Sequence, residues 1–87
     1  MSINTCSHVP RHVPDRPEQP FCEECVKTGD GWVHLRMCLH CGQVGCCDNS
    51  KNRHATKHFA ATGHAVMESV EPFEDWRWCY VDKVMVE

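Results

Sequence analysis

The chain has 87 residues, eight of them cysteine and seven histidine, and a formal net charge of -3. At this length we expect a single domain, and ten valines against only two leucines and one isoleucine leave its core so short of large aliphatic side chains that disulfides or a metal ion must help it fold. The mildly acidic charge argues against a nucleic-acid partner, which needs a clustered basic face, and the lack of any stretch of transmembrane length argues against membrane insertion.

The N-terminal part combines two candidate metal ligands with an extended arm. Residues 1–5 have no basic start and no apolar run, so we expect no signal peptide and a reducing, cytoplasmic environment. Cys6 and His8 then lie two residues apart. Residues 9–21 contain four of the five prolines. Because proline removes a backbone donor and fixes φ, this composition predicts an irregular arm, which we interpret as a linker.

Two C-x2-C pairs follow the arm, Cys22 with Cys25 and Cys38 with Cys41. Such a pair places two sulfurs along one edge of a tetrahedron, and this is a common way to begin a zinc site. The opposite edge must come from elsewhere, so each pair ties distant segments together.

Short strands are predicted around the second pair. Residues 29–31 mark a turn, and residues 32–38 mix aromatic and branched side chains at near alternation, which predicts a strand. Gly42 favours a left-handed turn directly after the second pair. Residues 44–46 predict another short strand, which ends at Cys46.

One helix is predicted in the second half of the chain. Asn49 and Ser50 can cap a helix that runs from about residue 51 or 52 to Thr62, and Gly63 is its C-terminal stop. Apolar residues recur inside it at helical spacing, so we expect Phe59 to join the core.

The C-terminal part reads as strands and a loop. Residues 65–70 predict a strand, and the proline and acids of residues 71–75 predict an exposed loop. Residues 76–81 and 83–86 are rich in aromatic and β-branched side chains, which predicts a final strand or hairpin.

Twelve side chains at these spacings are enough for three tetrahedral zinc ions. Zinc explains the pattern better than a disulfide scaffold does, because a disulfide protein has no need of so many histidines or of paired C-x2-C motifs. The candidate ligands are seven cysteines, four histidines and one aspartate: Cys6, His8, Cys22, Cys25, Cys38, Cys41, Cys46, His54, His58, His64, Cys79 and Asp82. We expect the metal to fold the chain.

Spacing alone leaves two ways to divide the central ligands. His54 and His58 lie on one face of the predicted helix and could share a zinc or reach two different ones. In one arrangement the four C-x2-C cysteines share a zinc, and Cys46 joins the three histidines on another. In the other the sites interleave, with Cys46 and His54 completing the first pair and His58 and His64 completing the second.

The ordered pattern Cys6-x-His8, two C-x2-C pairs, Cys46, His54-x3-His58-x5-His64 and Trp78-Cys79 closely resembles the UBP-type zinc finger. This module occurs in ubiquitin-specific proteases and in one class of histone deacetylase. The resemblance runs from Cys6 to about Asp82, and the short, stand-alone form looks like the prokaryotic branch of the family.

This resemblance implies an α+β fold, a small zinc-stabilised domain in which one or two helices pack on a twisted antiparallel sheet. It implies one domain over residues 1–87 that includes the proline-rich arm, and up to three zinc ions in interleaved, cross-brace-like sites. One zinc would take Cys6, His8, Cys79 and Asp82, a second Cys22, Cys25, Cys46 and His54, and the third Cys38, Cys41, His58 and His64.

Position 82 departs from the resembled pattern, because three-zinc members usually have cysteine there. A carboxylate can bind zinc, so we interpret Asp82 as a ligand of a weaker site. Cys47 is left as a spare, inert thiol. The remaining histidines are expected to have no metal: His12, His34 and His40.

Function follows from the same resemblance. In ubiquitin-binding members, a pocket receives the free C-terminal Gly-Gly tail of ubiquitin, and an arginine two residues after the cysteine that corresponds to Cys46 grips it. Asp48 stands at that position here and would repel a carboxylate. Trp78 and Tyr80 match the aromatic wall of the pocket, and Trp32 is added to it. We therefore expect a peptide or protein tail to bind in an aromatic-lined pocket, with a cationic or amine-bearing partner favoured over ubiquitin.

Two features of this pocket stay open at the level of sequence. Trp76, Trp78 and Tyr80 alternate and therefore share a face of the last strand, where they can form either a core or a pocket. A basic side chain could compensate for Asp48, and the candidates are Arg36, Lys51 and Arg53.

Two other function classes compete with a binding module. A zinc-dependent enzyme needs an open coordination position, and twelve ligands for three metals leave none; the His-x-Glu of zinc deaminases is also missing. A thiol/zinc redox sensor would release zinc on oxidation, yet ligation blocks the thiols of a redox catalyst. We therefore expect no enzyme.

Overall fold

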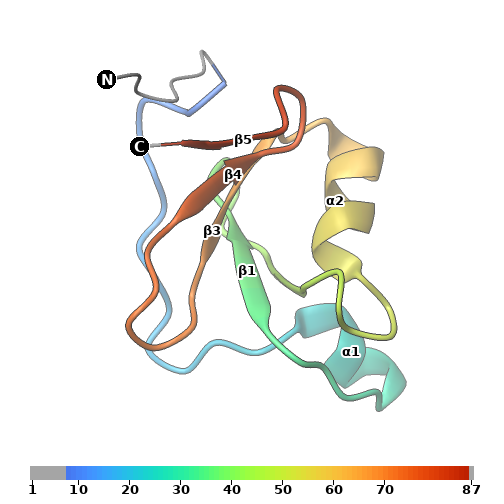
Figure 1. Ribbon diagram of the computed structural model, residues 1–87. Coiled ribbons are helices and arrows are strands. Elements are labelled where there is room, and N and C mark those ends of the chain that lie inside the picture. The colour runs from blue at the N-terminus through green and yellow to red at the C-terminus, as the bar shows by residue number, and fades with distance from the viewer. Residues whose placement is uncertain (1–7, 87) are drawn as a thin grey trace.

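Five short antiparallel strands form one sheet in the computed structural model, which describes residues 8–86 (Figure 1). They lie in the order β2-β1-β3-β4-β5. Their bounds are Leu35–Cys38 for β1, Val44–Cys46 for β2, Val66–Ser69 for β3, Arg77–Cys79 for β4 and Val84–Val86 for β5. Each strand lies within the range predicted for it, and the predicted α+β class is confirmed.

A short helix that the sequence reasoning missed, α1, spans Glu23–Thr28. The Cys22 sulfur caps it by accepting the backbone N–H of Cys25, and Gly29 ends it in the left-handed region. Six residues are too few to show an apolar period, so hydrophobic periodicity did not reveal this helix.

The longer helix, α2, spans His54–Thr62 and begins later than predicted. Ser50 does not cap it, because its hydroxyl oxygen accepts the backbone N–H of Val33 at 2.8 Å. Arg53 occupies the N-cap position in the left-handed region, with φ 48°. The N–H of His54 instead donates to the Cys46 sulfur at 3.2 Å. A cysteine therefore replaces the predicted cap, while Gly63 is confirmed as the C-terminal stop.

One face of the sheet carries the core. Register places Leu35 and Met37 of β1 on the same face as Val44 of β2 and Val66 of β3, and all four side chains are buried. The arm, residues 9–21, has no helix or strand and lies on the opposite side of the sheet from α2 (Figure 1). Val9 packs against this core, and Arg16 approaches the buried Glu68, so the arm does more than link two segments.

Helix α2 covers part of the other face at a point of close backbone contact. A Cβ atom built on Gly45 of β2 would lie 2.8 Å from the backbone nitrogen of Ala55 and 3.1 Å from its Cα. Only glycine leaves room for the helix at this distance. Phe59 is partly buried against the core and stacks on Tyr80, with 4.8 Å between ring centroids.

Beyond α2 this second face stays open. Register aligns Arg36 with Ser69, Met67 with Trp78, and Trp78 with Met85, so these side chains share the uncovered face. Neither helix in the described part of the chain has the length and apolarity needed to cross a bilayer.

Candidate metal centres and the adjoining groove

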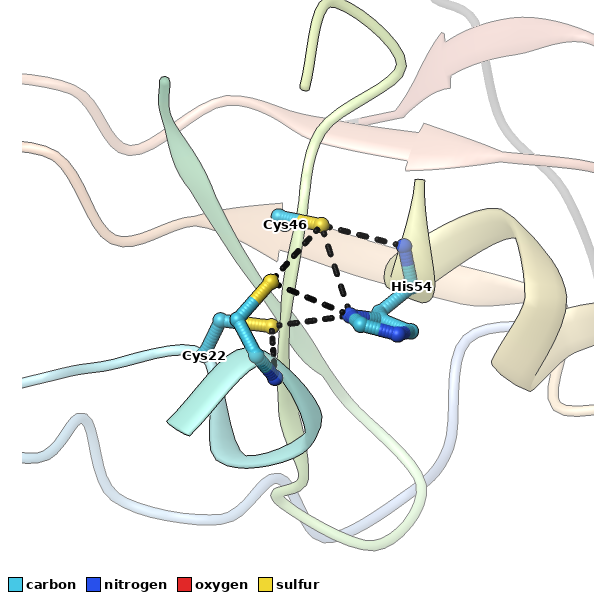
Figure 2. Close-up of side chains that lie close together, drawn as sticks. Cys22, Cys46 and His54 are labelled. Atoms are coloured by element: carbon cyan, nitrogen blue, oxygen red, sulfur yellow. Dashed lines mark hydrogen bonds between the residues drawn. The ribbon is translucent and has the colours of Figure 1, made fainter. Parts of the chain in front are cut away.

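The first cluster joins both helices to the edge strand. It consists of Cys22, Cys25, Cys46 and His54, whose ligand atoms all lie within 4.8 Å of one another. The Nδ1 atom of His54 is 3.2 Å from the sulfur of Cys22, 3.3 Å from that of Cys25 and 3.6 Å from that of Cys46. Figure 2 shows these side chains converging from α1, β2 and the start of α2.

These separations fit a tetrahedral zinc site. Zinc–sulfur bonds of about 2.3 Å and zinc–nitrogen bonds of about 2.0 to 2.1 Å place two sulfurs about 3.8 Å apart, and a sulfur about 3.6 Å from a nitrogen. The Cys25 and Cys46 sulfurs are 3.8 Å apart, and the sulfur–nitrogen distances lie at or slightly below the expected value. Three thiolates with one imidazole also form a usual donor set for structural zinc.

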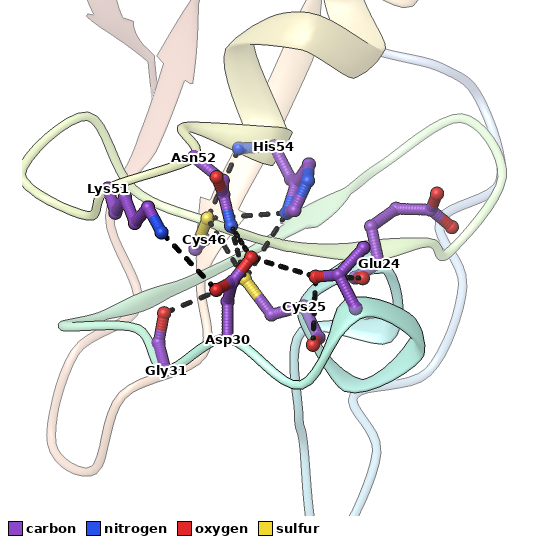
Figure 3. A network of polar contacts seen from close by, with 9 residues as sticks. Glu24, Cys25, Asp30, Gly31, Cys46, Lys51, Asn52 and His54 are labelled. Atoms are coloured by element: carbon purple, nitrogen blue, oxygen red, sulfur yellow. Dashed lines mark hydrogen bonds and ion pairs between the residues drawn. The ribbon is translucent and has the colours of Figure 1, made fainter.

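Backbone and amide N–H groups surround the sulfurs of the first cluster. The N–H of Cys25 donates to the Cys22 sulfur at 3.4 Å, and Nδ2 of Asn52 donates to the Cys25 sulfur at 3.6 Å. Asp30 in turn accepts from Asn52 at 2.9 Å (Figure 3). The pKa of Asp30 is lowered, chiefly by this bond from Asn52. Such outer contacts orient the ligands and tune the metal.

Burial sets the proton chemistry of the same cluster. The three cysteines are 0% exposed. Burial raises the pKa of the Cys22 thiol to about 12, so without metal this sulfur keeps its proton at neutral pH. A zinc ion binding here must displace protons, which makes its affinity depend on pH.

The second cluster lies at the other end of α2. It consists of Cys38, Cys41, His58 and His64. The Cys38 sulfur is 3.5 Å from Nδ1 of His64, and the Cys41 sulfur is 3.4 Å from Nε2 of His58. Burial, and then the neighbouring His64, lower the pKa of His58. A neutral imidazole is the form that binds metal.

The structure therefore brings together the interleaved set and not the alternative in which all four C-x2-C cysteines meet. His54 and His58, one turn apart on α2, face different clusters. Helix α2 therefore links the first two clusters, and its close contact with Gly45 positions both histidines.

The third cluster is smaller and more exposed. It contains His8, Cys79 and Asp82; Cys6, the fourth predicted member, lies outside the described residues. Nδ1 of His8 is 3.5 Å from the Cys79 sulfur and 3.2 Å from Oδ2 of Asp82. The side chains of His8 and Asp82 are 35% and 40% exposed. Asp82 thus lies where the pattern predicted a ligand, and its N–H donates to the Cys79 sulfur at 3.4 Å.

Four residues outside the predicted sites lie as follows. Cys47 is buried, and its sulfur is 3.6 Å from the Ser50 hydroxyl oxygen. Burial raises the pKa of Cys47, but hydrogen bonds led by Ser50 outweigh it and the pKa is lowered. His12 and His34 are exposed, and His40 stacks on His64 with ring centroids 5.2 Å apart. Sequence reasoning missed this packing role of His40, because no spacing rule pairs the two histidines.

A groove opens on the part of the sheet face that α2 leaves uncovered. It has a volume of about 320 Å³. Three of the four predicted partner-binding residues meet in it. Its lining residues are Arg36, Cys47, Asp48, Asn49, Met67, Trp76, Trp78, Tyr80 and Met85. The three aromatic residues are all partly buried and line a groove, so they are neither a closed core nor a flat surface.

Trp32, the fourth predicted partner-binding residue, is not among the groove's lining residues. It is 37% exposed on the loop between α1 and β1. Since β1 begins at Leu35 and not at residue 32, the pleat of the strand does not direct Trp32 toward the groove.

Residues 22–87 match the family model described as the zinc finger in ubiquitin hydrolases and other proteins. Mouse ubiquitin carboxyl-terminal hydrolase 45 is 36% identical over 67 residues, which are 72% of this chain and 8% of that protein. An Arabidopsis thaliana protein named BRAP2 RING ZnF UBP domain-containing protein 2 is 33% identical over 66 residues, 76% of this chain and 13% of that protein. This chain thus spans only about a tenth of such relatives.

Among solved structures, a protein of Rhodopseudomonas palustris determined by solution NMR is similar over the whole chain. Its sequence is 52% identical, the TM-score is 0.83, and the match covers 100% of this chain and 84% of that one. The similarity therefore extends over the arm as well as over the sheet and helices.

Proposed function

The chain belongs to the family of UBP-type zinc fingers, and we propose that it is a single zinc-folded domain, residues 1–87, that binds a peptide or protein tail and catalyses no reaction. Members of this family are zinc-finger modules that mediate protein interactions. The Cys/His clusters of this chain are compatible with up to three zinc ions. We propose that the protein works in the cytoplasm, where thiols stay reduced for metal binding.

Zinc ions would stabilise the fold and would take no part in catalysis. The proposed ligands are Cys22, Cys25, Cys46 and His54 for one ion; Cys38, Cys41, His58 and His64 for a second; and Cys6, His8, Cys79 and Asp82 for a third. The donor distances of the first two clusters support this division. Four protein ligands close a structural zinc site, whereas a catalytic one keeps a position for water or substrate.

The observation that carries the binding proposal is the groove of about 320 Å³ on the open part of the sheet. Its walls are aromatic and thioether side chains, and its polar groups are few, as in sites that receive a small ligand or a chain end. The groove lies on the sheet face opposite the arm, over the part that α2 leaves uncovered, so it is open to a partner.

Ubiquitin is not the ligand that we propose. Relatives carry the name ubiquitin hydrolase, but Asp48 lines this groove at the position where ubiquitin-binding members have an arginine. A tail that ends in two glycines brings a carboxylate and no cation to that aspartate.

Calorimetry on the zinc-loaded protein tests the proposal. The probes are a library of N-acetylated tetrapeptides, each as free acid and as amide, and intact ubiquitin. We expect a subset of the tetrapeptides to bind and ubiquitin to bind more weakly than the best of them. Trp78→Ala should abolish binding, while Trp32→Ala, outside the groove, should leave it unchanged. Binding that survives Trp78→Ala, or a library without a single binder, would refute the groove as the site.

A further inference from the structure

Arg36 is a partly buried cation in the groove that makes no ion pair with the described carboxylates. Its Nη1 donates to the backbone oxygen of Leu35 at 2.9 Å and to the Ser69 hydroxyl oxygen at 3.4 Å, and its Cζ lies 4.5 Å from the centroid of the Trp76 ring. Among the described residues no carboxylate reaches it within ion-pair distance, whereas Arg77 pairs with Glu68 at 2.8 Å. The hydrogen bonds of Arg36 thus go to neutral groups; the carboxylate of Glu74, which accepts from the Ser69 hydroxyl at 2.6 Å, lies beyond ion-pair distance and leaves the guanidinium able to pair with a ligand.

Asp48 presents the opposite charge to the same groove. It is exposed, and its Oδ1 accepts from the Thr56 hydroxyl at 2.5 Å. No cationic side chain in the described part of the chain lies within ion-pair distance of it. Like Arg36, this carboxylate is positioned by a neutral partner and keeps its charge free.

The two charges share the groove with one aromatic ring. Tyr80 lines the groove with both of them. The Tyr80 ring is held by stacking on Phe59, with 4.8 Å between the ring centroids. A ligand that covers the Tyr80 ring therefore meets a positive and a negative group at once.

A partly buried charge without a partner costs free energy that a complementary ligand can recover. Arg36 projects from the sheet and is the deeper of the two charges, while Asp48 lies in an exposed loop at the rim. The deeper position suits a short main-chain carboxylate, which a guanidinium can bind with two hydrogen bonds. The rim suits a long basic side chain, whose stem can lie along the faces of Trp78 and Tyr80.

Building on the tail-binding function proposed above, we propose that the groove selects a protein C-terminus that ends in lysine or arginine, with its free carboxylate on Arg36 and its basic side chain on Asp48. The volume of about 320 Å³ lies at the small end of ligand pockets, so it suits the last one or two residues of a chain. An acidic side chain fits less well, because the negative faces of the rings repel it.

Calorimetry with four related peptides tests this proposal. The probes are Ac-Gly-Gly-Lys as free acid, the same peptide as amide, and both forms with norleucine in place of lysine. We expect the lysine free acid to bind most tightly, and amidation or norleucine each to weaken binding about tenfold, the size expected for one charge-assisted contact. Equal binding of all four probes would overturn the inference.

Single substitutions test which residue is responsible for the preference for a free carboxylate and which for the preference for lysine. Arg36→Gln should remove the preference for free acid over amide and keep the preference for lysine. Asp48→Asn should do the reverse while keeping an acceptor for Thr56. Arg11→Gln and Asp75→Asn, which change exposed residues outside the groove, are the controls and should change neither preference. Zinc content and thermal melting show that each variant is folded.

The outcomes distinguish failure of this inference from failure of the tail-binding function on which it rests. If tetrapeptides bind in a Trp78-dependent manner but both variants keep both preferences, the charge assignment is wrong and the tail-binding function stands. If peptides with a free N-terminus and an acidic side chain bind better than Ac-Gly-Gly-Lys, the chosen polarity is wrong. If nothing binds, both proposals fail together.

Discussion

The first and third clusters use similar donors in opposite surroundings. The cysteines of the first cluster are 0% exposed and are contributed by α1 and β2, and His54 joins them from α2. In the third cluster, His8 and Asp82 are 35% and 40% exposed and join the arm to the turn between β4 and β5. All three cysteines of the first cluster lie in the core, whereas the third cluster joins exposed ligands to a single core cysteine, Cys79, and so ties the arm to the sheet. Residue type alone does not tell these two roles apart.

The largest expected effect comes from breaking the first cluster. Cys46→Ser removes a buried sulfur that also accepts the first N–H of α2. We expect loss of about one zinc per chain and loss of the cooperative fold, since structural zinc contributes on the order of 10 kcal/mol to domains that depend on it. Native mass spectrometry and thermal melting measure both effects. Cys47→Ser, one residue away, is the control and should keep every zinc.

A second variant separates the clusters that α2 bridges from the one that it does not touch. Gly45→Ala places a Cβ 2.8 Å from the backbone of Ala55 and should cost about 3 kcal/mol, because the helix backbone must move. The first two clusters should bind zinc more weakly and the third should not change. Gly31→Ala, whose Cβ meets nothing within 4 Å, is the matched control. Full zinc affinity in Gly45→Ala would show that α2 is not the bridge.

Chelation ranks the clusters directly. With two predicted thiolates, one imidazole and one carboxylate, and with exposed donors, the third site should release its zinc to a mild chelator first, which frees the arm. Asp82→Cys should delay that release and Asp82→Asn should hasten it. A titration followed by mass spectrometry gives the order. Release of all three zinc ions at the same chelator concentration would contradict the difference between the exposed third cluster and the buried first cluster.

The smallest effect concerns the outer contacts of the first cluster. Asn52→Ala removes the amide that donates to the Cys25 sulfur, and we expect about a tenfold loss of zinc affinity at that cluster only. The control is Asn49→Ala, which changes an amide that does not contact a cluster sulfur among the described residues. Competition with a chelator of known affinity measures the loss.

The Asn52→Ala variant should also change the pKa of Asp30. The pKa of Asp30 is lowered chiefly by Asn52, so the ionised carboxylate stabilises the fold above its unfolded pKa, and that contribution disappears as pH falls through the lowered folded value. In Asn52→Ala the pKa of Asp30 should rise toward its ordinary value. Carboxyl NMR titration detects this; an unchanged pKa would show that Thr28 and Lys51 suffice.

Short-range features of this protein were predictable from sequence. Alternation located β1, aromatic and β-branched composition located β4 and β5, and Gly63 marked the end of α2. The C-x2-C pairs and the His-x3-His spacing picked out side chains that the structure gathers into clusters, with Cys6 outside the described residues. These signals are local, because turn chemistry and side-chain periodicity depend on residues a few positions apart.

Contacts between distant segments decided the rest. A cysteine sulfur and not Ser50 receives the first N–H of α2, which explains why that helix begins at His54. The approach of α2 to Gly45 lets His54 and His58 face different clusters, a division that spacing left open and that only the family resemblance implied. The pairing of β1 with β3, far apart in the chain, brings Arg36 into one groove with Asp48 and the last aromatic residues. Packing in three dimensions chose among arrangements that sequence spacing allowed equally.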